Sequence, residues 1–178
     1  MNVPNFLSLV RIALVPVFAV VFFLPDPNAR LWAALIYAAA FLTDIADGWI
    51  ARHYNKITKL GRVLDPLADK LMTFTVIACI TIKGIIPVWA VVIFACKELS
   101  MLIGGALMLH RTKDVIPSNW LGKASTGVFF VVCAVLVLFP IPSAWATGLM
   151  AGALALTVAA LIRYAFGFRK VVKKAPEG

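Results

Sequence analysis

The segment from Asp44 to Asp69 reads DIADGWIARHYNKITKLGRVLDPLAD, and it joins two strongly apolar stretches of the chain. It contains four of the eight acidic residues of the protein. Carboxylates within apolar segments are costly, and they persist mainly where they face a cavity, a partner or an ion. The segment therefore predicts a functional site formed by Asp44, Asp47, Asp65 and Asp69.

The apolar character extends along the whole chain. Of its 178 residues, 62% are hydrophobic and 14% are charged, whereas soluble domains have about a quarter charged residues. We therefore interpret residues 1–178 as one all-α integral membrane domain. The net charge of +9 does not indicate nucleic-acid binding, because the basic residues lie in short loops between apolar runs. Anionic lipid headgroups of the bilayer are their expected partners.

Six runs of about twenty apolar residues predict six transmembrane helices. Their expected ranges are 6–24, 31–52, 61–82, 86–109, 120–139 and 144–166. The first run leads into further spans, so no removable signal peptide is expected. Most basic residues outside the spans fall on the side of both termini and of the loop between the second and third spans. This asymmetry predicts that the termini and the aspartates are on the cytoplasmic side of the cell membrane.

The start of the chain has a mixed polar and apolar pattern over residues 4–11. Asn5, Ser8 and Arg11 are three residues apart and share one helix face. We expect an amphipathic segment that lies in the headgroup plane before the first span. The alternative is an ordinary helix start with a snorkelling arginine.

The second and third spans are expected to form an antiparallel hairpin. Residues equidistant from its turn lie at the same depth, which pairs Asp44 with Asp69 and Asp47 with Asp65. The aspartates of each span are three or four residues apart and share a helix face. At about 1.5 Å per residue, the site would lie roughly 8–13 Å in from the cytoplasmic helix ends. We expect a polar cavity that opens to that side.

Four carboxylates in a low-dielectric region require either protonation of some or compensation by cations. Oxygen ligands without His or Cys suit hard cations such as Mg²⁺ or Mn²⁺. Two such ions between helices could bind phosphate groups and support a displacement at phosphorus. Arg52 could offer a planar fork to a phosphate. Small residues would allow close approach, although tight helix packing is an alternative explanation for them: Gly48, Ala51 and Gly61.

This spacing resembles the signature of the CDP-alcohol phosphotransferase family, D-x2-D-G-x2-A-R-x8-G-x3-D-x3-D, at every defined position. The resemblance implies a phospholipid-synthesising enzyme with two bound metal ions. CDP-diacylglycerol would bind, an acceptor hydroxyl would attack the β-phosphorus, and CMP would leave. All four aspartates would be metal ligands, with Asp69 also the general base. The resemblance further implies a CDP-binding set: Asn5, Asp47, Gly48, Ala51, Arg52 and Gly61.

Other segments are similar to the bacterial phosphatidylglycerophosphate synthases of this family, whose acceptor is glycerol 3-phosphate. These segments are 4–11, 64–70 and 120–123. A phosphorylated acceptor needs cationic groups near the metals. The candidates are Lys97, Arg111, Lys123 and Arg163. Snorkelling anchors are the alternative for Lys123 and Arg163, and an ion pair with Glu98 is the alternative for Lys97.

The pattern departs from those synthases at Gly104-Gly105, where they carry an arginine. Cardiolipin synthases of the same family, which use phosphatidylglycerol as acceptor, are therefore the alternative. A cation transporter or channel is a remote alternative, because it would need a polar path to the far side, and the first, fifth and sixth spans are almost wholly apolar in their outer halves. Small residues on the last span are compatible with a homodimer.

Overall fold

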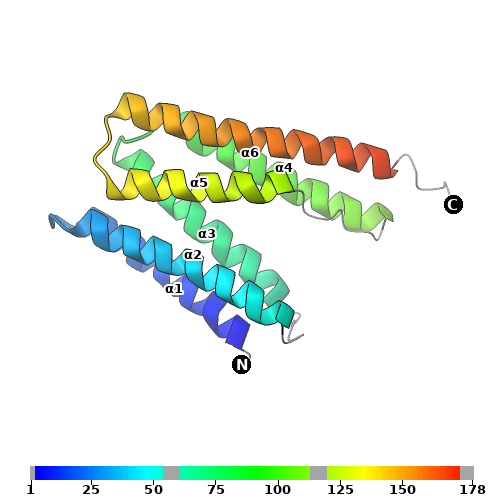
Figure 1. Ribbon diagram of the computed structural model, residues 1–178, viewed down its shortest axis with the longest axis horizontal. Helices are drawn as coiled ribbons and strands as arrows, with labels where there is room; N and C mark the ends of the chain where they lie inside the picture. Colours follow the sequence, from blue (N-terminus) through cyan, green and yellow to red (C-terminus); the bar gives the residue numbers. More distant parts are fainter. Residues whose placement is uncertain (1–2, 54–60, 113–119, 173–178) are drawn as a thin grey trace. The chain divides into compact units, whose positions relative to one another are not determined.

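The computed structural model describes residues 3–53, 61–112 and 120–172, and their side chains over 6–46, 66–105 and 120–166. Within these ranges all regular structure is helical (Figure 1). The helices are α1 (Val3–Phe23), α2 (Ala29–His53), α3 (Gly61–Ile82), α4 (Val88–Thr112), α5 (Trp120–Leu138) and α6 (Ser143–Val172). The predicted all-α fold is confirmed, and each predicted span coincides with one helix.

Five of these helices are long and apolar enough to cross a membrane: α1, α2, α4, α5 and α6. The helix α3 carries Asp65, Asp69 and Lys70 in its N-terminal half. Its 22 residues correspond to roughly 33 Å, about the thickness of the hydrocarbon core. By length, α3 therefore matches the third predicted span.

The helix ends follow from local sequence. After α3, Gly84 adopts a positive φ of 70°, which glycine accommodates without steric cost. Gly84 N donates to Thr81 O at 2.8 Å, and Ile85 N donates to Ile80 O at 3.0 Å. This pair of hydrogen bonds is the Schellman motif that ends many helices. Before α2, Asn28 N donates to Asp26 Oδ1 at 2.6 Å, which closes the turn after α1.

Residues 1–85 and 133–141 form one compact unit. Its core consists of buried apolar side chains from α1, α2, α3 and the end of α5: Phe18, Phe22, Ala33, Tyr37, Val76, Ile77, Ile80, Cys133, Leu136 and Val137. The Phe18 ring lies 5.7 Å from the Phe22 ring and 6.2 Å from the Tyr37 ring, between centroids. The contact between Phe18 and Tyr37 joins α1 to α2.

The helix α1 packs against both helices of the predicted hairpin. The helices α2 and α3 run antiparallel, as expected (Figure 1). In the described part of this unit, however, α1 packs extensively against both of them, while α2 and α3 contact each other at few positions. The antiparallel course of the predicted hairpin is thus present, and its packing near the turn, where the side chains of residues 47–65 fall outside the description, stays a prediction. The apolar surface of α1 supports both helices.

The expected interfacial segment is the beginning of α1. This helix runs without a break from Val3 to Phe23 and includes Pro16. Ser8 and Arg11 are both buried, so the polar face of this segment turns into the unit rather than toward headgroups. Because Arg11 is buried, it also differs from the snorkelling arginine that was the alternative.

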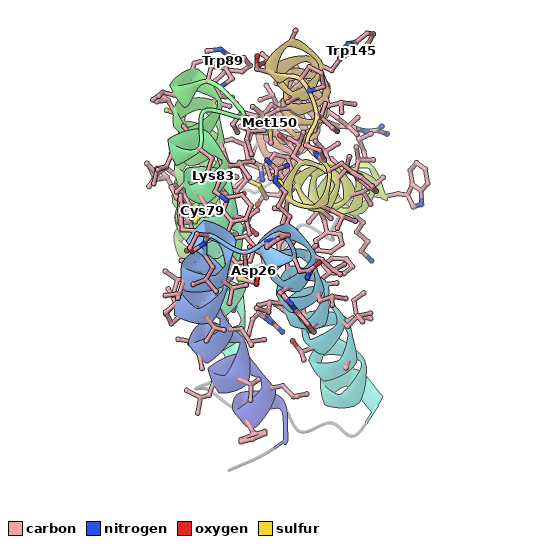
Figure 2. The ribbon with its side chains drawn as sticks, turned by 90° about the vertical axis from the view of Figure 1, so that its left-hand side faces the viewer. Asp26, Cys79, Lys83, Trp89, Trp145 and Met150 are labelled. Carbon is pink, nitrogen blue, oxygen red and sulfur yellow. The ribbon has the colours of Figure 1, made fainter. Side chains whose placement is uncertain are left out.

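Residues 86–132 and 142–178 form a second compact unit. Here α4 contacts α6, and the rings of Phe94 and Phe129 stack with centroids 5.1 Å apart. Trp89 and Trp145 are exposed near the starts of α4 and α6 (Figure 2), as is typical of aromatic residues at a membrane interface. The last helix extends to Val172, six residues beyond the predicted span, because a helix can continue through basic residues outside the apolar layer.

Lys83 attaches the end of α3 to the end of α1 (Figure 2). Its Nζ donates to Phe22 O and lies 4.1 Å from the centroid of the Phe22 ring. A cation suits this place, because the last carbonyl groups of a helix are unsatisfied and carry negative partial charge.

We expect Lys83→Met to lower the apparent melting temperature of the detergent-purified protein by roughly 2–4 °C, corresponding to about 1 kcal/mol for an exposed cation–π contact. Lys83→Arg retains a cation at this position and should lie closer to the wild type. A thermal-shift measurement on the three proteins checks this. An unchanged melting temperature in Lys83→Met would contradict the stabilising role of Lys83.

Candidate functional site

Two of the four signature aspartates fall within the described side chains, and both belong to the first compact unit. Asp44 lies in the C-terminal half of α2, and Asp69 lies in the third turn of α3. Each carboxylate is 41% exposed, although both helices are largely apolar. Two acidic side chains of this unit therefore remain accessible to a ligand.

Asp44 is held by an arginine from α1. Arg11 Nη1 donates to Asp44 Oδ1 at 2.7 Å, across 33 residues of sequence. The side chain of Arg11 is only 2% exposed, and Arg11 is among the largest fully buried side chains in the described part of the chain. The short distance and the opposite charges make this a strong, charge-assisted hydrogen bond.

Arg11 was not among the site residues predicted from the sequence. Its position near the start of an apolar run is typical of a topology anchor. The available signal was its three-residue spacing from Ser8, which is also buried. A polar pair on one face of an otherwise apolar helix indicates that this face points toward other polar groups.

Asp69 has a different environment from Asp44. Lys70 Nζ lies 3.9 Å from Asp69 Oδ2, and the Lys70 side chain is 40% exposed. An ion pair at this distance between exposed groups contributes little to stability. Thr73 Oγ1 donates to the backbone oxygen of Asp69 at 3.0 Å, not to its carboxylate. The neighbouring Ala68 is fully buried, which fixes the helix face on which Asp69 lies.

The remaining predicted residues of this site lie on helices whose backbone is described, while their side chains fall outside the description. They are Asn5 on α1, Asp47, Gly48, Ala51 and Arg52 on α2, and Gly61 and Asp65 on α3. The predicted pairing of the four aspartates into two layers therefore stays a prediction.

The two described aspartates fit a divalent metal ion by their chemistry. Carboxylate oxygens are the preferred ligands of Mg²⁺ and Mn²⁺, and both groups keep accessible surface. Among the side chains at 6–46, 66–105 and 120–166, no three His, Cys, Asp or Glu residues come together. These ranges include only two of the four expected ligands, Asp44 and Asp69.

The candidates for binding an acceptor phosphate belong to the second unit. Lys97 on α4 donates from Nζ to Glu98 Oε1 at 2.6 Å, and the two side chains are 12% and 8% exposed. Lys97 thus forms the ion pair with Glu98 that was the alternative to binding an acceptor phosphate. Lys123 on α5 and Arg163 on α6 are exposed, and the side chain of Arg111 on α4 falls outside the description.

The sequence profile of the CDP-alcohol phosphatidyltransferase family matches residues 1–159. A CDP-diacylglycerol--glycerol-3-phosphate 3-phosphatidyltransferase from Bacillus subtilis (strain 168) is 33% identical over 153 residues, which cover 79% of each chain. The protein of the same name from Rickettsia bellii (strain RML369-C) is 35% identical over 137 residues, or 77% of this chain and 75% of the relative.

A cardiolipin synthase (CMP-forming) from Streptomyces coelicolor is 33% identical over 129 residues, or 71% of this chain and 60% of the relative. The profile match extends over the signature and five of the six helices in full, so the resemblance inferred from the spacing of the aspartates is confirmed. The chain belongs to the CDP-alcohol phosphatidyltransferase family.

Proposed function

We propose that the protein transfers the phosphatidyl group of CDP-diacylglycerol to glycerol 3-phosphate, giving phosphatidylglycerophosphate and CMP. The observation that carries this proposal is the complete signature from Asp44 to Asp69, in a chain whose family match spans 1–159. Two relatives named for this reaction, at 33% and 35% identity, support the choice of acceptor. Membership in a transferase family argues against the remote alternative of a cation transporter or channel.

We place the enzyme in the cell membrane, with both termini and the aspartates on the cytoplasmic side. The distribution of lysine and arginine supports this orientation, since Arg30 and Lys83 are the basic residues expected outside. The whole chain, residues 1–178, would act as one catalytic domain. A homodimer through the small residues Gly148 and Gly152 of α6 is part of this proposal.

The four aspartates would hold Mg²⁺ or Mn²⁺, in a site for two ions. When bound, such ions offset the charge of the phosphates and of the displacement at phosphorus. Asp44 and Asp69 are both accessible for this role. The family resemblance also assigns the CDP portion to Asn5, Asp47, Gly48, Ala51, Arg52 and Gly61.

Asp69 would accept the proton of the acceptor hydroxyl. The acceptor oxygen then forms a bond to the β-phosphorus, the bond from that phosphorus to the bridging oxygen breaks, and CMP leaves with the electron pair. A general base must reach the hydroxyl that it deprotonates. The 41% exposure of the Asp69 side chain meets that requirement.

Apolar side chains beside the aspartates support a lipid donor. Leu42 and Ile45 flank Asp44 on α2, Leu67 and Leu71 flank Asp69 on α3, and all four are exposed. In a bilayer, such side chains contact hydrocarbon. A donor with a charged headgroup and two acyl chains could therefore place the headgroup at the carboxylates while its chains stay in the membrane.

Phosphatidylglycerol is the second candidate acceptor, which would make the protein a cardiolipin synthase. A Cβ at Gly104 would lie 3.9 Å from Tyr164 Cε1, and a Cβ at Gly105 would meet no atom within 4 Å. The glycerol-3-phosphate enzymes that the chain resembles carry an arginine at this position, whereas in this chain a Cβ at Gly105 would meet open space. The engagement of Lys97 by Glu98 and the cardiolipin synthase among the relatives also favour this candidate.

We expect an acceptor screen on purified protein to show CMP release from CDP-diacylglycerol with glycerol 3-phosphate. The assay contains Mg²⁺ and compares glycerol 3-phosphate, phosphatidylglycerol and no acceptor. Release with phosphatidylglycerol alone would replace the proposed acceptor with the second candidate. Failure with every acceptor, in protein shown to be folded, would contradict both.

We expect Asp69→Asn to reduce CMP release by about 10²–10⁴-fold, the usual contribution of a general base. Binding of CDP-diacylglycerol should be reduced far less, because Asn keeps the size of the side chain and the other donor-binding groups are unchanged. Asp26→Asn is the matched control, since Asp26 lies in the turn before α2. Turnover by Asp69→Asn at the wild-type rate would exclude Asp69 as the base.

We expect Lys123→Ala to raise the KM for glycerol 3-phosphate several-fold more than the KM for CDP-diacylglycerol. The physical reason is the loss of a positive charge that would bind the acceptor phosphate. Lys123→Arg retains the charge and serves as the control. Steady-state kinetics with each substrate varied in turn measure both constants, and an unchanged acceptor KM would show that Lys123 is a topology anchor.

A further inference from the structure

The buried guanidinium of Arg11 is the least expected charge in the described part of the chain. Arginine stays protonated in proteins, and a buried positive charge is costly without a partner. Its side chain is 2% exposed, and its Nη1 lies 2.7 Å from Asp44 Oδ1. A signature carboxylate thus supplies negative charge to Arg11.

The exposure of the two partners is unequal. Arg11 is enclosed, whereas the Asp44 carboxylate is 41% exposed. An enclosed cation is held by the packing around it, so its bond to Oδ1 restricts the rotation of an accessible carboxylate. Groups that hydrogen-bond to metal-binding carboxylates in this way orient them and adjust their affinity.

The helix that carries Arg11 also sets the frame of the site. In the described part of the first unit, α1 packs against α2 and α3, which contact each other at few positions. The orientation of Asp44 on α2 is therefore tied to the helix that also supports α3 and Asp69. Arg11 provides a polar connection between that frame and the signature.

We propose that Arg11 is a positioning residue of the carboxylate site: its hydrogen bond to Oδ1 fixes the orientation in which Asp44 would present its carboxylate to a divalent cation. This inference rests on the part of the proposed function in which the aspartates hold that cation. It adds a residue from outside the signature, and Arg11 itself touches neither substrate nor metal.

The test measures binding of Mn²⁺ to the full-length protein in detergent, without lipid substrates. Electron paramagnetic resonance of the free ion gives the Kd for the wild type, Arg11→Lys and Arg11→Met. We expect Arg11→Met to weaken binding by about 10–100-fold. Arg11→Lys should lie between the two, because lysine keeps a hydrogen-bond donor for Asp44 but lacks the planar fork. In CMP-release assays, the Mn²⁺ concentration for half-maximal activity should rise in the same order.

Arg30→Met is the matched control, since Arg30 lies at the start of α2, away from Asp44 in the same helix. It should bind Mn²⁺ as the wild type does. A folded Arg11→Met variant with the wild-type Kd would overturn the proposal, and so would a wild-type protein that binds no Mn²⁺. Folding is checked by gel filtration and thermal shift.

If Arg11→Met does not fold, Arg11→Lys carries the test in a double-mutant cycle with Asp44→Asn. The effect of Arg11→Lys on the Kd should disappear in the Asp44→Asn background. An equal effect in both backgrounds would overturn the action through Asp44.

The two proposals fail separately. If Mn²⁺ binding depends on Arg11 but no acceptor yields CMP, the proposed reaction is wrong and the role of Arg11 stands. If CMP is released and the Kd for Mn²⁺ is independent of Arg11, only the role of Arg11 is wrong.

Discussion

The cost of keeping charged groups among apolar helices governs this structure. Several of the described charges on the helices have a nearby compensating group. Arg11 reaches Asp44 from another helix, Lys97 reaches the adjacent Glu98, and at the end of α3 Lys83 reaches the Phe22 carbonyl and ring. The first of these differs from the others, because one partner is enclosed and the other is accessible. Because of this difference in exposure, the Asp44 carboxylate is available to a ligand, whereas the Glu98 carboxylate is buried in its ion pair.

The same cost explains the role of α1. A pair of helices with acidic faces cannot gain stability by packing those faces together, so their support must come from elsewhere. The apolar side chains of α1, with Phe18 and Phe22 fully buried, provide that support to both α2 and α3. The family signature thus lies on two helices, and a third helix supports both of them.

Much of this could be predicted from the sequence. Runs of about twenty apolar residues are set by the thickness of the bilayer, so the six helices and most of their ends were accessible in advance. The fixed spacing of the aspartates gave the family. The contact between Arg11 and Asp44 was not accessible, because helix periodicity says which residues share a face but not which other helix that face meets. The packing of α1 against both α2 and α3 was not accessible for the same reason.

The exposed leucines and isoleucine beside Asp44 and Asp69 have a consequence for how a lipid donor would arrive. Removing an acyl chain from the bilayer costs about 0.8 kcal/mol for each methylene group, which is prohibitive for two long chains. A headgroup site bordered by hydrocarbon-facing side chains avoids this cost, because the donor diffuses sideways within one leaflet and the lipid product leaves by the same route. The lipid donor then reaches the site by diffusion in the plane of the membrane, and only the water-soluble reactants arrive from the aqueous phase.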